Sequence, residues 1–321
     1  MRKALIIGIN KYDRCELFGC VNDAKHVKNL LIENEDKSHN FDIMELIDEN
    51  ATADNIISAI EDLYKNDDEL TILYFSGHGY DNHNDGAIVC VDNKTLGFQT
   101  LMNYVQNAKS KYNVIILDCC YSGKLANYYQ IGDKTILPNN TVILTACRPE
   151  EPAIDNLEVN HGTFTNLLIG ALNGGASDIL GRITPGSIYS YIDQALGSWE
   201  QRPYFKANVS SFVSLRNANP RIELAELKEG LSLFINPSHL LRLDPSYEET
   251  NVKGNRQHAA IKPYVKKENV LKMKLLQKMN QNGLVIPTSE KYMYYAAMNN
   301  SYVGLTELGK HYWNLYKNNR I

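Results

Sequence analysis

The sequence has none of the long apolar segments that membrane insertion or secretion requires. No run approaches the roughly 20 apolar residues that a membrane-spanning helix needs. The apolar stretch near the N-terminus, residues 4–9, is shorter than the core of a signal peptide, and it is followed by Asn10 and Lys11 instead of a small-residue cleavage site. We therefore expect a cytoplasmic protein without membrane contact.

The cysteines do not have the spacing of a metal site. The six cysteines are Cys15, Cys20, Cys90, Cys119, Cys120 and Cys147. They do not form the paired spacings of zinc ligands, and two adjacent cysteines are poorly placed for a disulfide with each other. Since no secretion signal is visible, we expect reduced thiols and no cofactor.

No charge of one sign dominates the sequence, because the net charge is only −4. The distribution is nevertheless uneven. Residues 221–321 contain 15 of the 33 Lys and Arg residues but only 9 of the 37 Asp and Glu residues, so this part carries +6 and residues 1–220 carry −10. Hydrophobic residues make up 44%, which is enough for a substantial core. Opposite charges in two parts of the chain predict two modules with different tasks.

Short apolar runs alternate with segments of helical periodicity through the first two thirds of the chain. The expected strands are residues 3–9, 44–48, 70–76, 86–91, 112–117 and 141–146. The expected helices are residues 22–32, 52–64, 98–108 and 164–172. This alternation predicts an α/β layered domain, residues 1–218, with a mainly parallel central sheet flanked by helices. Regularity breaks at Asn219-Pro220, so residues 219–321 are expected to form a smaller second domain.

Two polar clusters end expected strands of this sheet, Ser76-Gly77-His78-Gly79 and Asp118-Cys119-Cys120-Tyr121-Ser122-Gly123. Such sheets bind ligands outside the carboxyl ends of their strands, so His78 and Cys120 can meet there if their strands are neighbours. An imidazole beside a thiol stabilises the nucleophilic thiolate and later protonates the leaving amine. Backbone N–H groups near Gly79 and Cys120 would bind the oxyanion. Taken singly, a histidine is usually a surface or core residue and a buried cysteine a small hydrophobe.

These clusters stand in the same order as in the caspase-like cysteine peptidases, and the sequence resembles the metacaspase and bacterial orthocaspase branch of that family. The matching segments are residues 4–9 (ALIIGI), 19–24 (GCVNDA), 74–79 (YFSGHG), 118–123 (DCCYSG), 145–148 (TACR), 162–165 (GTFT) and 201–203 (QRP). Each motif is modest alone, but the ordered set is specific. The resemblance covers about residues 1–213, and the Gln-Ala-Cys signature of animal caspases is absent.

The resemblance implies a peptidase with a Cys–His dyad. His78 is then the base, and Cys120, the third residue of Asp-x-Cys-x-Ser-Gly, is the nucleophile. The adjacent Cys119 is the rival nucleophile, but it takes the place of a small residue in the motif. Because strand side chains alternate, the side chain of Cys119 should also point the other way if the strand continues.

The resemblance further implies a primary specificity pocket built from Cys20, Asp23, Ser76 and Asp118. Two carboxylates in a partly buried pocket are costly without a partner. A substrate Arg or Lys would satisfy them, and Arg could bind bidentately, so we expect cleavage after Arg or Lys. The ordinary alternatives are that Asp23 caps a helix and that Asp118 only ends a strand.

Several relatives need calcium, which they bind through aspartates beyond the histidine and after the nucleophile. Asp81, Asp85 and Asp92 are available here, but Ala108-Lys109-Ser110 and Asn127 stand near where further acids would be expected. We therefore predict no metal site and no calcium requirement.

Many relatives are also cut in the loop after the nucleophile, and the basic candidates for such autoprocessing are Lys124 and Lys134. Plain surface lysines are the alternative.

Residues 260–321 resemble a winged helix-turn-helix. We expect helices at residues 269–279 and 305–316 and strands at residues 284–286 and 292–298, the two strands forming the wing. A group of nearby lysines would suit a phosphate backbone; it comprises Lys266, Lys267, Lys272, Lys274 and Lys278. A solvated helix face is the alternative. Winged helices also dock proteins, and we favour a regulatory protein partner or self-inhibition over DNA.

The expected function is a cysteine endopeptidase that acts on protein or peptide substrates and is controlled through its tail. Bacterial members of the group often resemble effectors in stress or antiphage responses, so the resemblance implies a regulated effector protease. Two other classes stay open. The first is a regulatory protein- or DNA-binding protein with a caspase-like body, against which the intact His78 and Cys120 pair argues. The second is another thiol hydrolase on a similar sheet, which the acidic pocket disfavours.

Overall fold

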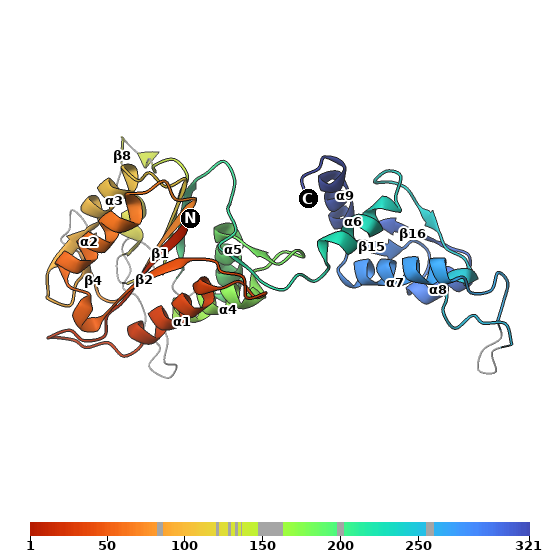
Figure 1. The fold of residues 1–321 in the computed structure, drawn as a ribbon, viewed down its shortest axis with the longest axis horizontal. Coiled ribbons are helices and arrows are strands. Elements are labelled where there is room, and N and C mark those ends of the chain that lie inside the picture. Colours follow the sequence, from red (N-terminus) through yellow and green to blue (C-terminus); the bar gives the residue numbers. More distant parts are fainter. Residues whose placement is uncertain are drawn as a thin grey trace. The chain divides into compact units, whose positions relative to one another are not determined.

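The computed structural model describes residues 1–81, 86–119, 122–127, 130–131, 134–135, 137–146, 163–197, 202–254 and 260–321. The chain divides into two compact units, Met1–Asn219 and Pro220–Ile321, which Figure 1 shows in colours that follow the sequence. Each unit has buried apolar side chains of its own. In the described part of the chain, no helix is both long and apolar enough to cross a membrane.

A six-stranded sheet forms the centre of the first unit (Figure 1). The strands are β1 (Arg2–Gly8), β2 (Asp42–Ile47), β3 (Leu70–Ser76), β7 (Tyr112–Asp118), β10 (Thr141–Thr145) and β12 (Tyr204–Asn208). Their order across the sheet is β12-β10-β7-β3-β1-β2. All neighbours pair in parallel except β12, which is antiparallel to β10. The predicted α/β architecture with a mainly parallel central sheet is confirmed, whereas strand β12 was not predicted.

Successive residues of the central strands point to opposite faces of the sheet and build two cores. On β1, Leu5 and Ile7 belong to one buried cluster, whereas Ala4 and Ile6 belong to the other. Helices α2 (Ala53–Tyr64) and α3 (Phe98–Gln106) contribute to the first cluster, and α1 (Cys20–Ile32), α4 (Thr163–Gly170) and α5 (Pro185–Ala195) to the second. A strand covered on both faces is apolar along its whole length, which explains why every residue of β3 is buried.

A small antiparallel sheet follows the carboxyl end of β3. It consists of β4 (Gly79–Asp81), β5 (Gly86–Val89) and β6 (Thr95–Gly97), in that order. The strand predicted over residues 86–91 is therefore present, but it ends at Val89 and belongs to this small sheet. Only His78 and Gly77 separate β3 from β4, so the small sheet fixes the backbone on the far side of the predicted base.

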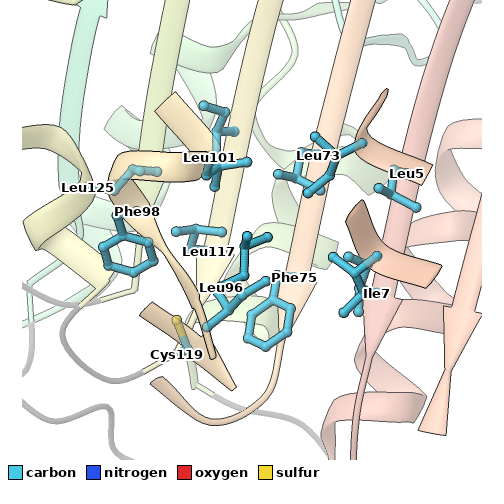
Figure 2. Close-up of a cluster of buried hydrophobic side chains, with 14 of the residues drawn as sticks. Leu5, Ile7, Leu73, Phe75, Leu96, Phe98, Leu101, Leu117, Cys119 and Leu125 are labelled. Atoms are coloured by element: carbon cyan, nitrogen blue, oxygen red, sulfur yellow. The ribbon is translucent and has the colours of Figure 1, made fainter. Parts of the chain in front are cut away.

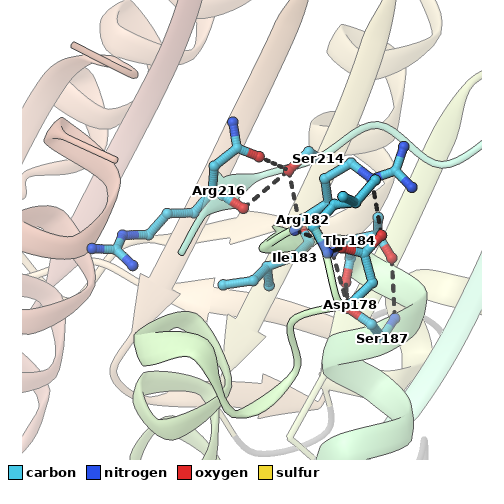
Figure 3. A network of polar contacts seen from close by, with 9 residues as sticks. Asp178, Arg182, Ile183, Thr184, Ser187, Ser214 and Arg216 are labelled. Atoms are coloured by element: carbon cyan, nitrogen blue, oxygen red, sulfur yellow. Dashed lines mark hydrogen bonds and ion pairs between the residues drawn. The ribbon is translucent and has the colours of Figure 1, made fainter. Parts of the chain in front are cut away.

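A network of polar contacts links the segments of the C-terminal part of the first unit (Figure 3). The Asp178 carboxylate accepts hydrogen bonds from the backbone N–H and the side-chain Nε of Arg182, both at 2.9 Å. Ser214 Oγ donates to the carbonyl of Arg216 at 3.0 Å. The two short strands of this region, β11 (Arg182–Ile183) and β13 (Arg216–Asn217), pair antiparallel. The buried Arg216 guanidinium also binds Glu35 at 2.8 Å, which attaches β13 to the segment that follows α1.

The second unit combines helices with a three-stranded antiparallel sheet of order β14-β16-β15. Its helices are α6 (Leu224–Ser232), the 3₁₀ turn η4 (Pro245–Tyr247), α7 (Lys267–Gln281), α8 (Met293–Met298) and α9 (Glu307–Lys317). Its strands are β14 (Leu241–Arg242), β15 (Val285–Pro287) and β16 (Tyr302–Leu305). Helix α7 ends before Asn282-Gly283, where Gly283 has a φ of 69°, a conformation that favours glycine.

The strand predicted over residues 292–298 is wrong, because these residues form helix α8. The tyrosine-rich composition favours a strand, but the buried residues Met293, Ala296 and Ala297 follow a helical spacing. Tyr294 and Tyr295 remain exposed. The strand that pairs with β15 is β16, which follows α8 in the sequence.

Candidate active site

The two predicted catalytic segments leave neighbouring strands at the same edge of the sheet. Strands β3 and β7 are parallel neighbours, and their register places Ser76 opposite Asp118. The predicted base His78 stands two residues beyond Ser76, and Cys120, the predicted nucleophile, stands two residues beyond Asp118. Cys120 itself and the adjacent Tyr121 lie outside the described residues. The register thus brings together the strands of both motifs, as the parallel-sheet argument requires.

His78 is held through its ring and its backbone. The ring Nε2 lies 2.6 Å from the carbonyl oxygen of Cys15. The backbone N–H donates to the Tyr12 hydroxyl at 3.0 Å, and the carbonyl accepts from Val89 N–H at 2.9 Å. Because a carbonyl can only accept, the bond to Cys15 requires the proton to be on Nε2. In the neutral imidazole this leaves Nδ1 as the nitrogen that can take a proton.

The glycine before His78 is required by packing. A Cβ atom at Gly77 would lie 2.5 Å from the Tyr12 hydroxyl and 2.8 Å from the ring of Phe75. Both neighbours are buried, so neither can move away easily. On the other side of His78, Gly79, which is predicted to supply an oxyanion N–H, is the first residue of β4 and pairs with Ile88. The Ser-Gly-His-Gly motif therefore lies where the chain passes from the central sheet to the small sheet, and the packing there leaves no room for a Cβ atom at Gly77.

An acidic cluster lies beside the carboxyl ends of the same strands. Asp23 projects from α1 and is only 2% exposed, and its carboxylate accepts from Ser76 Oγ at 3.4 Å. Cys20, the first residue of α1, is also buried. The N-cap position of α1 belongs to Gly19, and Asp23 lies one turn further on. Its contact with Ser76 turns Asp23 toward β3.

Asp118 stands opposite Ser76 in the register of β3 and β7, and two hydroxyl groups extend from its carboxylate. Thr165 Oγ1 donates to the Asp118 carboxylate at 2.7 Å and lies 2.7 Å from the Tyr74 hydroxyl. Since the single Thr165 proton goes to the carboxylate, Tyr74 is the donor in the second bond. Burial raises the pKa of Tyr74 well above its usual value, and the negative charges of Asp23 and Asp118 raise this pKa further. Asp23 contacts Ser76, and Ser76 stands opposite Asp118 in the strand register, so the two carboxylates lie near the same strand ends.

Cys119 lies on the opposite side of its strand from Asp118. It is 1% exposed and belongs to the same core cluster as Leu117, Phe75 and Phe98. Figure 2 shows its sulfur among these side chains. A thiol buried in this way packs as a small hydrophobic group, and the alternation along the strand explains why it faces the core.

The lysines considered for autoprocessing and the aspartates considered for calcium have structural partners where they are described. Lys124 Nζ pairs with Asp81 at 2.5 Å, and both side chains are about one-fifth exposed. Asp92 accepts from the N–H of Ala53 and pairs with a lysine. Asp85 and the side chain of Lys134 lie outside the described residues. Among the residues that are described, no group of three or more His, Cys, Asp or Glu side chains could hold a metal ion.

Sequence reasoning missed three residues that contact the candidate site. Tyr12 and Cys15 come from the segment between β1 and α1, and Thr165 comes from α4. None of the three stands in a strand-end polar cluster. Thr165 belongs to a matching segment of the family resemblance, which is the one signal that could have pointed to it.

Comparison with known proteins identifies the family. The model of the caspase domain family matches residues 1–211. Metacaspase-1A of Neurospora crassa is 32% identical over 149 residues, and metacaspase-4 of Arabidopsis thaliana is 30% identical over 154 residues. These alignments cover 39% and 42% of this chain, but only 32% and 37% of the two relatives.

A solved structure shares the fold. The crystal structure of a Geobacter sulfurreducens protein superposes with a TM-score of 0.52 and 19% identity, covering 68% of this chain and 97% of the other. At this identity the likeness describes the fold alone. Because the family model extends over most of the chain and coincides with the first unit, the chain belongs to the caspase domain family.

Proposed function

We propose that the protein is a cysteine endopeptidase that hydrolyses peptide bonds after Arg or Lys. The proposal rests on the register of β3 and β7, which aligns Ser76 with Asp118 and so directs both catalytic segments to one edge of the sheet. Family membership supports the chemistry, since the matched model is that of the caspase domain. The substrates are proteins or peptides.

In the proposed mechanism, His78 activates Cys120. Nδ1 takes the thiol proton, because Nε2 is engaged by the Cys15 carbonyl. The thiolate attacks the peptide carbonyl carbon, the C–N bond breaks, and the imidazolium gives its proton to the leaving amine. Water then hydrolyses the thioester and regenerates the thiol. Backbone N–H groups of Gly79 and Cys120 are the proposed oxyanion donors, each stabilising the transition state by about 3 kcal/mol.

The burial of Cys119 supports the assignment of Cys120 as the nucleophile. A nucleophile must reach both the base and the substrate, whereas Cys119 is 1% exposed within an apolar cluster. A thiol in such surroundings is inert, because burial disfavours the thiolate. Cys119 is therefore proposed to be structural.

The acidic cluster supports the proposed specificity. Asp23 and Asp118 approach one region from α1 and β7, and Ser76 and Thr165 hold their carboxylates in place. Two carboxylates concentrate negative charge at this place, so the cluster favours a cationic side chain over a neutral or acidic one. An Arg side chain offers a planar fork that binds carboxylates bidentately, and Lys offers a single charge.

Hydrolysis of matched peptides tests the proposal. Fluorogenic peptides that differ only in a final Arg, Lys or Asp are given to the wild type, to Cys120→Ala and to the adjacent control Cys119→Ala. We expect cleavage of the Arg and Lys peptides by the wild type and by Cys119→Ala, and none by Cys120→Ala. Equal turnover of the Asp peptide would refute the specificity, and activity that survives in Cys120→Ala would refute the nucleophile.

The second unit is proposed to be a winged-helix-like module that regulates the protease, and this assignment includes the predicted boundary near residue 219. The elements follow one another as α6, β14, η4, α7, β15, α8 and β16, and β16 lies between β14 and β15 in the sheet. The helices that precede this three-stranded sheet support the assignment, whereas α8 stands where a winged helix has a turn between its two wing strands. Two of the five clustered lysines have acidic partners, Lys274 with Glu249 and Lys278 with Glu226. These ion pairs reduce the charge available to phosphates and favour a protein contact over DNA. Retention of the full chain on DNA that weakens with salt would reverse this preference.

A further inference from the structure

Tyr12 is a buried residue that touches the proposed base in two ways. It is 4% exposed and lies in the segment between β1 and α1. Its hydroxyl accepts from the backbone N–H of His78 at 3.0 Å and donates to the carbonyl of Val89 at 3.2 Å. Its ring lies against the imidazole, with centroids 4.5 Å apart and planes tilted by 53°. Burial raises the pKa of Tyr12, so the hydroxyl keeps the proton that it donates.

The hydroxyl takes the place of one hydrogen bond in the β4–β5 ladder. The register pairs Gly79 with Ile88, so His78 stands opposite Val89. The bond from Val89 N–H to the His78 carbonyl is direct, at 2.9 Å. The reciprocal bond, from His78 N–H to the Val89 carbonyl, runs through the Tyr12 hydroxyl. In an antiparallel pair both bonds would normally be direct, so Tyr12 holds His78 away from the ladder.

The segment that carries Tyr12 is itself fixed. The buried carboxylate of Asp48 accepts from the backbone N–H groups of Asn10 and Lys11, at 2.7 and 3.1 Å. The carbonyl of Asn10 accepts from Leu17 N–H at 2.9 Å, which closes the segment into a loop. The same loop supplies the Cys15 carbonyl that binds His78 Nε2. One anchored loop therefore sets both the backbone and the ring of the base.

We propose that Tyr12 is a positioning residue for catalysis, whose inserted hydroxyl keeps His78 out of the β4–β5 ladder and its imidazole turned toward the nucleophile. This inference rests on the proposed role of His78 as base. Without the hydroxyl, His78 N–H and the Val89 carbonyl can bond directly, which draws the backbone of His78 toward β5. A small misplacement of a catalytic group lowers the rate by roughly 10- to 100-fold.

The test is Tyr12→Phe, which keeps the ring and removes only the hydroxyl. The matched control is Tyr64→Phe, because Tyr64 is equally buried and its hydroxyl has no hydrogen-bond partner among the described residues. For the Arg peptide we expect kcat to fall by about 10- to 100-fold in Tyr12→Phe, with KM within twofold of the wild type. The acid limb of the kcat/KM pH profile should move to higher pH, since a displaced imidazole no longer favours the thiolate. Tyr64→Phe should leave kcat and the profile unchanged.

A second readout separates this inference from the proposed function. The rate of iodoacetamide alkylation at Cys120 is measured against pH by mass spectrometry in the wild type, Tyr12→Phe and His78→Ala. If the wild type alkylates at lower pH than His78→Ala but cleaves no peptide, the proposed function fails while the test of Tyr12 stands. The plot of alkylation rate against pH has an inflection. If the inflection of Tyr12→Phe moves toward the inflection of His78→Ala, the inference is supported. An unchanged inflection, or an unchanged kcat and pH profile, overturns it. A kcat loss without any pH shift means that Tyr12 is only structural, and it overturns the inference as well.

Discussion

The acidic cluster makes a quantitative prediction about Asp118→Asn. The asparagine keeps the shape of the side chain, and its Oδ1 can still accept from Thr165, while the negative charge is removed. An interaction with a charged group contributes about 1.5–3 kcal/mol net, and each 1.36 kcal/mol changes a rate constant tenfold. We therefore expect kcat/KM for Arg and Lys peptides to fall by about 10- to 150-fold.

The assay is steady-state hydrolysis of peptides that differ only in the residue before the cleaved bond. The matched control is Asp36→Asn, because Asp36 is an exposed carboxylate whose hydrogen bonds, among the residues described, go to its neighbour Ser38. It follows the far end of α1, which is roughly 20 Å long, whereas the cluster lies at the near end. The kcat/KM of Asp36→Asn for Arg and Lys peptides should stay within twofold of that of the wild type. Arg cleavage that is unchanged in Asp118→Asn would refute the argument that this carboxylate selects the substrate.

Three further predictions concern stability, titration and processing. Thr165→Val removes the acceptor of the buried Tyr74 hydroxyl, so the free energy of unfolding should fall by about 1–3 kcal/mol in urea titrations; an unchanged midpoint would contradict the bonded chain. Burial raises the pKa of the Cys90 thiol from its usual 9.0 to about 12, so the folded state holds a proton that the unfolded state loses. Between pH 9 and about 12, the unfolding free energy of the wild type should therefore fall with pH more steeply than that of Cys90→Ala. The difference in slope should be about 1.4 kcal/mol per pH unit. Parallel plots of unfolding free energy against pH would argue against this burial. Because Lys124 is partly buried against Asp81, mass spectrometry of any self-cleaved chain should show no cut after Lys124, and a cut there would require the ion pair to open.

The sequence predicted the layered architecture because the signals for it are local. Apolar runs of strand length and helical periodicity can be recognised within short segments, and the central strands of the sheet were located in this way. Strand order and register arise from contacts between distant segments, and no local pattern encodes them. Strand β12 shows the same limit, since its residues Tyr204–Asn208 have polar ends and partly exposed side chains.

The misassigned helix α8 has a related cause. Its tyrosines favour a strand when composition alone is considered. The burial of Met293, Ala296 and Ala297 decides the conformation instead, and burial depends on the rest of the second unit. Tertiary packing here overrides the local propensity.

At the candidate site, the sequence predicted the residues that stand in strand-end motifs and missed those that support them. His78 and Asp118 could be singled out because Asp118 is the last residue of an apolar strand and His78, between two glycines, stands just beyond the end of another. Tyr12 and Cys15 reach His78 across more than 60 positions of the chain. Nothing in their immediate surroundings indicates that contact.

Covalent trapping with an active-site reagent can identify both the nucleophile and the preferred side chain in one experiment. The protein is incubated with a peptidyl chloromethyl ketone that ends in Arg, and the adduct is located by mass spectrometry in the wild type and in His78→Ala. We expect a single adduct on Cys120 that forms much more slowly in His78→Ala. A reagent that ends in Asp should label Cys120 much more slowly than the reagent that ends in Arg. An adduct on Cys119, or equal labelling by the two reagents, would contradict the proposed function.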